Sequence, residues 1–162
     1  MTDTPPPATG QTLEDADAFA ALLAPGSRLL GLDLGTKTIG LALSDVNRTI
    51  ASSLETIRRK KFTIDVVVLL DIAEKHKIAG FVLGLPVNMD ASEGPRAQAT
   101  RSFARNLNQR CGLPILLWDE RMTTQAATRL LIEADSSRKR RAEVVDKMAA
   151  TLILQGALDR MR

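Results

Sequence analysis

Residues 30–45 read LGLDLGTKTIGLALSD, and this stretch decides how the rest of the chain folds. Its large apolar side chains alternate with small or polar residues on either side of a short turn: Leu30, Leu32, Leu34, Ile39, Leu41 and Leu43. Alternation with a period of two in neighbouring segments predicts a β-hairpin with one buried face. The opposite face carries one acid among residues with almost no side chain: Asp33 with Gly31, Gly35, Gly40 and Ala42.

Asp33 is the first candidate for a functional residue. A carboxylate in the middle of a strand is costly unless something pairs with it, and metal coordination is one common solution. Small neighbours also let a bulky ligand approach the backbone closely. The alternative is that Asp33 only bonds nearby backbone groups and shapes the turn. We favour a ligand role, because a turn-forming Asp belongs in the turn and Asp33 precedes it.

The composition is that of an ordinary globular protein, with 44% apolar and 25% charged residues among 162. Aromatic residues make up only 3%, which disfavours a nucleic-acid binder that stacks bases on aromatic platforms. The net charge is +3, and the first 27 residues hold four acids and no Lys or Arg. The basic remainder favours a polyanionic partner. A single cysteine and the lack of a membrane-length apolar run predict a cytoplasmic protein with no membrane partner.

The pattern of elements predicts one α/β domain over residues 28–162. Residues 1–11 are expected to be a disordered tail, and residues 12–27 a short covering helix and linker, with Thr12 and Asp15 as a capping box. Five strands are expected, in a sheet that begins with the antiparallel hairpin, continues with parallel strands and is flanked by helices. The later strands fall at about 50–57, 79–84 and 113–118, and helices at about 63–77, from Pro95, from Thr123 or Thr124, and at 142–160.

Three acids can converge in such a sheet. Asp33 comes from the first strand, Glu120 from the exit of the last strand, and Asp146 from the inner face of the final helix. Hard oxygen ligands without Cys or His select Mg²⁺ or Mn²⁺, and paired divalent ions can drive phosphodiester hydrolysis. Simpler interpretations are that Glu120 forms an exposed ion pair with Arg121, and that Asp146 only complements the helix dipole.

Two runs of basic residues can also be interpreted either structurally or functionally. Residues 58–61 include Arg58 and Arg59, and residues 138–141 include Arg138, Lys139 and Arg140. Such runs are usually solvated loops, and in a nucleic-acid-binding protein they contact phosphates. Phosphate contacts do not distinguish RNA from DNA.

Four segments resemble the YqgF/RuvX family of Holliday-junction-resolvase-like nucleases: LGLDLGTKTIGLALSD (30–45), VLGLPVNMDASEGPRA (82–97), WDERMTT (118–124) and DKMAATLILQGALD (146–159). They occur in order across about residues 28–160. The resemblance implies an RNase H-like fold and a role in maturing the 5′ end of the small-subunit ribosomal RNA precursor. It implies partners that are nucleic acid, chiefly precursor rRNA, and ribosomal particles.

The resemblance also assigns roles to individual residues. Asp33, Glu120 and Asp146 would be the catalytic metal ligands for Mg²⁺ or Mn²⁺, with Asp119 a weaker candidate acid. Residues in the same motifs would lie near substrate: Lys37, Asn88, Arg96, Arg121 and Thr124. Two positions depart from the pattern: Ala91 stands where the family usually has Gly, and Gly84 stands where related junction resolvases have an acid. Glu120 must then supply that charge from the neighbouring strand.

Three other functions remain open from the residues alone. The same site could cleave branched DNA instead of RNA. The Asp-x-Gly-Thr stretch at Asp33 also occurs in actin-like sugar kinases, although this chain is short for their paired domains. Finally, the chain could be a non-enzymatic binder of ribosomal RNA or of transcription factors, with structural acids.

Overall fold

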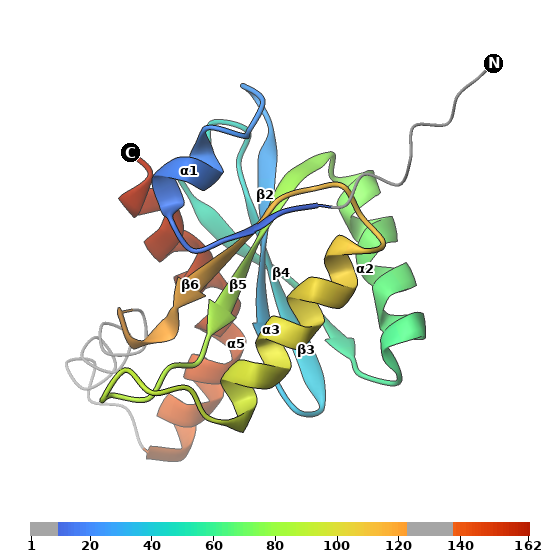
Figure 1. Ribbon diagram of the computed structural model, residues 1–162. Helices are drawn as coiled ribbons and strands as arrows, with labels where there is room; N and C mark the ends of the chain where they lie inside the picture. Colours follow the sequence, from blue (N-terminus) through green and yellow to red (C-terminus); the bar gives the residue numbers. More distant parts are fainter. Residues whose placement is uncertain (1–9, 123–137) are drawn as a thin grey trace.

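The computed structural model describes residues 10–122 and 138–162, with side chains described at 10–122 and 148–162 (Figure 1). The strands are β1 (Thr12–Leu13), β2 (Arg28–Leu34), β3 (Thr38–Ser44), β4 (Ala51–Arg58), β5 (Ile78–Leu85) and β6 (Ile115–Asp119). The helices are α1 (Ala16–Ala20), α2 (Phe62–Lys75), α3 (Pro95–Asn108) and α5 (Arg138–Arg160). Within the described ranges, no helix is both long and apolar enough to cross a membrane.

The strands form one mixed sheet in the order β1-β6-β5-β2-β3-β4. The antiparallel hairpin of β2 and β3 is confirmed, with Asp33 opposite Gly40, and β4 continues it antiparallel. On the other side of β2, the strands β5, β6 and β1 are parallel. The expected count of five strands is wrong by one, because β1 has only two residues and therefore no alternating pattern that sequence could reveal.

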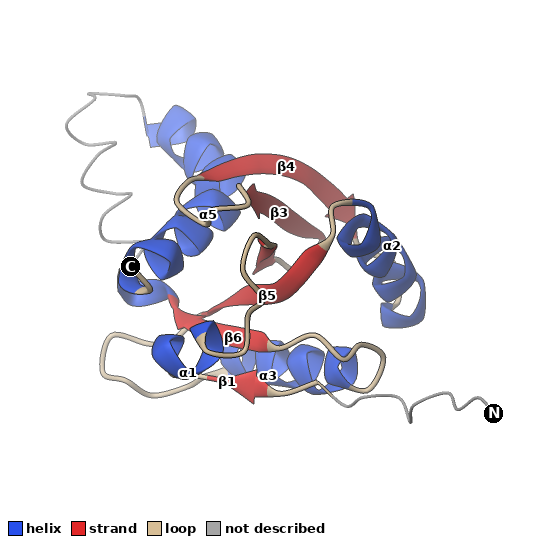
Figure 2. Ribbon diagram, turned by 90° about the horizontal axis from the view of Figure 1, so that it is seen from above, coloured by secondary structure: helices blue, strands red, loops and turns tan. Residues whose placement is uncertain are grey.

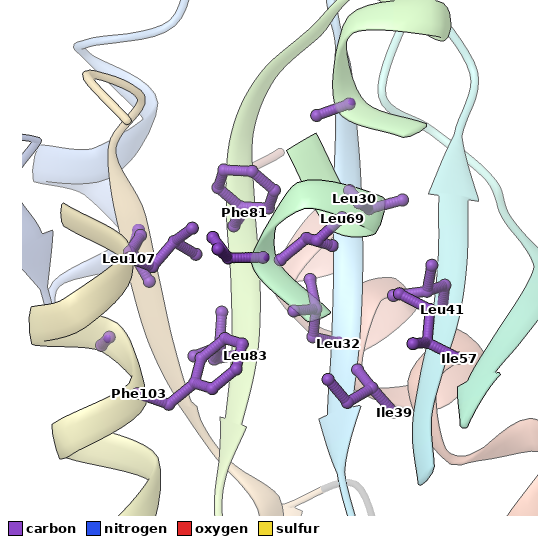
Figure 3. Packing of buried hydrophobic residues seen from close by; sticks show 14 of the residues in the cluster. Leu30, Leu32, Ile39, Leu41, Ile57, Leu69, Phe81, Leu83, Phe103 and Leu107 are labelled. Atoms are coloured by element: carbon purple, nitrogen blue, oxygen red, sulfur yellow. The ribbon is translucent and has the colours of Figure 1, made fainter. Parts of the chain in front are cut away.

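Helices cover both faces of the sheet, with α5 and α2 on opposite sides in Figure 2. Against α2 and α3 lie Leu30, Leu32, Ile39 and Leu41, together with Phe81 and Leu83 (Figure 3). The other face packs against α1 and α5, so the hairpin is covered on both faces rather than on one. Gly31 permits this, because a methyl group there would lie 2.8 Å from Leu154 Cβ of α5. The glycine face of the hairpin is therefore a helix-packing surface around Asp33.

The segment before β2 is built into this sheet. Gly10 N donates to Asn108 O at 3.2 Å, and Ile115 N donates to Gln11 O at 2.8 Å. The helix expected from Thr12 is wrong in its start, because Thr12 is in β1 and Asp15 is the N-cap of α1. The backbone N–H groups at the start of a helix lack partners within the helix, and an N-cap side chain can accept from one of them. Asp15 Oδ1 does so, because it accepts from Asp17 N at 3.0 Å.

The final helix begins earlier than expected. α5 starts at Arg138 rather than near residue 142, so the second basic run is helical and not a loop. The helix expected after Thr123 or Thr124 lies outside the described residues. α5 is fastened to the sheet edge by Gln155, whose side chain accepts from Ala51 N at 2.9 Å and donates to Thr49 O at 3.0 Å.

Phe19 tests whether the N-terminal segment contributes to stability. It is 0% exposed, and its ring fills the space over Gly80, where a methyl group would lie 2.9 Å from the ring. Phe19→Ala should lower the free energy of unfolding by about 3–5 kcal/mol in urea denaturation, because it leaves a cavity. Leu22→Ala is the matched control, since Leu22 is 48% exposed, and it should cost less than about 1 kcal/mol. Equal losses would contradict this packing.

Candidate active site

Asp33 and Glu120 meet at one edge of the sheet. Asp33 lies near the end of β2, and Glu120 follows β6 directly. β2, β5 and β6 are parallel, so their carboxyl ends share this edge. β5 separates the two strands, yet the carboxyl groups of Asp33 and Glu120 lie close enough for the charge of Asp33 to raise the pKa of Glu120. The structure thus brings together two of the three acids that the sequence singled out.

Gly84 of β5 provides the space for this contact. A methyl group at Gly84 would lie 2.6 Å from Glu120 Oε1 and 2.5 Å from Ile153 Cδ1. Such distances are shorter than side-chain atoms tolerate, so any residue with a Cβ at this position would force the side chains of Glu120 and Ile153 to move. The sequence departure at Gly84 therefore has a structural reason: Glu120 reaches across β5 over a residue that has no side chain.

The surroundings of Glu120 favour its neutral form. Burial raises the pKa of its carboxyl group to about 7, and the negative charge of Asp33 adds to the shift. The positive charge of Arg96 acts in the opposite direction. The protonated form of Glu120 is therefore favoured over its usual balance near neutral pH, since two neighbouring carboxylates resist full ionisation. A cation placed between them would remove that resistance.

Asp146, the third predicted ligand, belongs to α5, but its side chain is outside the described ones. Ala150 follows it by one helical turn, and Ala150 Cβ lies 3.8 Å from the position a methyl group would take on Gly40, the partner of Asp33 in the hairpin. Among the described side chains, no three acids, histidines or cysteines gather closely enough to hold a metal ion. The placement of Asp146 as a third ligand stays a prediction.

Asp119 and Arg121 pair with each other. Arg121 Nη2 lies 2.6 Å from Asp119 Oδ2, and Arg121 Nε lies 3.1 Å from Asp119 Oδ1. The guanidinium group holds the pKa of the Asp119 carboxyl below its usual range. The alternative interpretation, an ion pair of Glu120 with Arg121, is wrong, because Arg121 pairs with Asp119 and Glu120 lies beside Asp33.

The loop after β5 is held by its own side chains. Asn88 Nδ2 donates to Ser92 Oγ at 3.0 Å, and Ser92 N donates to Asp90 Oδ1 at 3.0 Å. Asn88, expected near substrate, thus shapes the loop that borders the site. Sequence reasoning missed Arg101, which binds Glu93 through two bonds of 2.6 and 2.7 Å and so ties this loop to α3. No spacing rule links the two residues.

The predicted substrate contacts fall into three groups. Arg96, Arg59, Arg58 and Lys37 surround the turn between β2 and β3, close to Asp33. Arg121 is engaged with Asp119, and Thr124 lies outside the described residues. Arg138, Lys139 and Arg140 form the first turn of α5, with side chains that are not described.

The fold is RNase H-like. It resembles Thermus thermophilus RuvC in complex with a Holliday junction substrate, with a TM-score of 0.51 at 14% identity over 83% of this chain and 96% of that one. It resembles yeast mitochondrial Ydc2 with a TM-score of 0.50 at 14% identity, over 89% of this chain and 85% of that one. A family model described as RuvX, Holliday junction resolvase, matches residues 27–160. The chain belongs to the RuvX family of nucleases.

Relatives with much higher identity carry a name that refers to RNA. A protein of Ruegeria pomeroyi is 60% identical over 149 residues, covering 92% of this chain and 97% of its own, and a protein of Rhodobacter capsulatus is 63% identical over 145 residues, covering 90% and 91%. Both are named "Putative pre-16S rRNA nuclease". The sequence resemblance to this family is thereby confirmed.

The shifted pKa of Glu120 predicts how stability depends on pH without divalent ions. Because its pKa is raised from its ordinary value to about 7, the contribution of Glu120 to stability should be greatest below its unfolded pKa and be lost as pH rises through 7. Glu120→Gln removes this ionisation and should be more stable than wild type at pH 8 by about 1–3 kcal/mol. Urea denaturation in EDTA at pH 4 and pH 8 measures the difference, which should be smaller at pH 4. A constant difference would contradict a raised pKa.

Ala91 predicts a stabilising substitution. Its φ is 73°, in the left-handed region that L side chains rarely adopt, and a non-glycine residue there costs roughly 1–2 kcal/mol. Ala91→Gly should raise the free energy of unfolding by about 0.5–1 kcal/mol, since the more flexible unfolded chain offsets part of the gain. Ala99→Gly within α3 is the control and should be destabilising. Loss of stability in both variants would contradict the strain at Ala91.

Proposed function

We propose that this protein is a Mg²⁺- or Mn²⁺-dependent nuclease that cleaves precursor ribosomal RNA and matures the 5′ end of 16S rRNA. The observation that carries the proposal is the contact between Asp33 and Glu120, two acids from separate strands at the ligand-binding edge of a parallel sheet. Membership of the RuvX family supports the hydrolysis of nucleic acids, and the relatives' names support the RNA substrate.

The site residues fit a hard divalent cation. Asp33 and Glu120 offer only carboxylate oxygens, which Mg²⁺ and Mn²⁺ prefer. Burial and the charge of Asp33 raise the pKa of Glu120, and a bound cation would favour the ionised form of both acids. Asp33 and Glu120 would hold the ion, with Asp146 as the proposed third ligand. A bound ion would supply an activated water and stabilise charge on the phosphate.

The chain's own residues would then position the substrate and handle protons. Without a bound cation, Glu120, whose pKa is raised to about 7, can hold a proton at its carboxyl oxygens close to neutral pH. As a ligand of the cation it would be ionised. Arg96 lies close enough to lower the pKa of Glu120, so its positive charge reaches the place where a phosphodiester would be attacked. Loop residues 86–94, fastened by Arg101, border the site.

Different observations support RNA and branched DNA as the substrate. The family description names a Holliday junction resolvase, and the fold resembles RuvC, which keeps branched DNA as the second candidate substrate. The fold likeness is at 14% identity, whereas relatives at about 60% identity carry the RNA name. We therefore propose RNA as the substrate. Cleavage of a four-way DNA junction in preference to a precursor 16S rRNA fragment would contradict this choice.

Asp33→Asn tests the mechanism directly. It should reduce cleavage of a precursor 16S rRNA fragment by roughly a thousandfold or more, because a ligand to the cation and its charge are lost. Mn²⁺ should raise the melting temperature of the wild type but not that of Asp33→Asn, since only a bound ion stabilises the folded state. Circular dichroism reports whether the variant is folded.

Asp119→Asn is the matched control for this experiment. It removes an acid that precedes Glu120 by one residue but is already paired with Arg121. Its cleavage rate should stay within roughly tenfold of wild type, and Mn²⁺ should still raise its melting temperature. Full activity of folded Asp33→Asn would remove the proposed mechanism, and a Mn²⁺ effect that is equal in wild type and Asp33→Asn would remove the metal site.

A further inference from the structure

A small hollow lies beside the candidate active site, on the face of the sheet that carries α3. It is bounded by the turn between β2 and β3 and by the first half of α3, and both lie at the same end of the molecule (Figure 1). Its volume is about 80 Å³, a size suited to a small group. The lining includes Gly35, Thr36, Arg59, Arg96, Thr100 and Phe103.

Two guanidinium groups from different elements converge on this hollow. Arg59 Nη1 donates to Gly35 O at 2.7 Å, and Arg96 Nη2 donates to Leu34 O at 3.4 Å. Each guanidinium carries five N–H donors, and within the described part of the chain each makes only this one hydrogen bond. Neither forms a salt bridge with a described acid. Most of their donors are therefore available to an anionic ligand.

The basic surface continues past the turn. A second, open hollow of about 520 Å³ shares Thr36 and Arg59 with the first and is also lined by Lys37 and Arg58. No acid lines either hollow. Lys37 and Arg58 are exposed, so a chain of phosphates can pass from the first hollow onto them. Arginine forks match the geometry of phosphate oxygens better than any other side chain does.

The position of the hollow relates it to the acid pair. Leu34 and Gly35, which form one wall, directly follow Asp33 in the chain. Successive residues of β2 face opposite sides of the sheet, so Asp33 faces α5 while Leu34 faces the hollow on the α3 side. A nucleic-acid strand that rounds the β2–β3 turn at this end of the sheet can reach both. The acids repel phosphates until a cation binds, whereas the two arginines attract them.

We propose that this hollow binds the phosphate adjacent to the scissile one, through the guanidinium groups of Arg59 and Arg96. The inference rests on the proposed nuclease function and adds the path of the substrate strand: from the acid pair, over the β2–β3 turn, toward Lys37 and Arg58. Arg59 and Arg96 are positioning residues in this arrangement, and their bonds to Gly35 O and Leu34 O orient them toward the ligand.

The test is the salt dependence of RNA binding. Asp33→Asn protein, with and without Arg59→Gln or Arg96→Gln, is titrated in EDTA with a precursor 16S rRNA fragment over a range of salt concentrations. Each phosphate contact contributes roughly 0.7–0.9 to the slope of log affinity against log salt. Each arginine variant should lower the slope by about that amount and weaken binding roughly tenfold. Arg96→Lys should recover most of the slope, because it keeps the charge.

Arg105→Gln is the matched control, since Arg105 is an exposed arginine of the same helix whose one side-chain bond to a described residue is to Ser102. It should leave the slope unchanged. Unchanged slopes in the Arg59 and Arg96 variants, equal changes in all three variants, or no RNA binding at all would overturn the phosphate site. A thermal melt shows whether Arg59→Gln has loosened the turn, and Arg96→Gln, whose bond is longer, then decides alone.

The two hypotheses fail separately in parallel assays. If the wild type with Mn²⁺ does not cleave the fragment but the slope differences persist, the nuclease function is wrong and the phosphate site stands. If cleavage occurs and the slopes do not change, the phosphate site is wrong and the nuclease function stands. Cleavage with changed slopes supports both.

Discussion

The contact between the carboxyl groups of Asp33 and Glu120 is the constraint on which the site depends. The two acids belong to strands that are not neighbours, since β5 runs between β2 and β6. Only a missing side chain on β5 lets Glu120 reach across, and Gly84 provides it. The low solvation that results, together with the charge of Asp33, raises the pKa of Glu120 to about 7. The close approach of the two acids therefore requires both the parallel arrangement of the strands and a glycine at position 84.

The same requirement extends to α5, which covers this face of the sheet. Its close approach needs Gly31 beneath Leu154, and Ile153 of the same helix closes over Gly84 beside Glu120. Gln155 anchors the helix to the backbone at the start of β4. Because a helix is rigid over a few turns, these contacts also fix where the backbone of Asp146 lies. The small residues of the hairpin therefore let α5 pack closely, and this packing sets the position of α5 beside the acid pair.

Much of the fold could be predicted from the sequence because its signals are local and periodic. Alternation in residues 30–45 gave the hairpin, and α2, α3, β5 and β6 lie within a few residues of their predicted positions. β1 could not be predicted, since two residues carry no period, and the helical start of α5 was hidden by a run of charges that resembles a loop. For the site, the convergence of Asp33 and Glu120 followed from parallel topology. The Asp119–Arg121 pair did not, because side-chain rotamers decide which acid an arginine meets.

The charges around the acid pair are of two kinds: acids that are paired with arginines, and arginines that can attract a phosphate. Two other acids near this edge each pair with an arginine, Asp119 with Arg121 and Glu93 with Arg101. These pairings leave Asp33 and Glu120 as the proposed site for a cation. Arg96 stands between this place and the β2–β3 turn, since it both lowers the pKa of Glu120 and lines the hollow beyond. A nucleic-acid substrate needs both the cation at the acid pair and the arginines of the hollow. A cation alone would attract a phosphate without setting the direction in which the strand leaves the site.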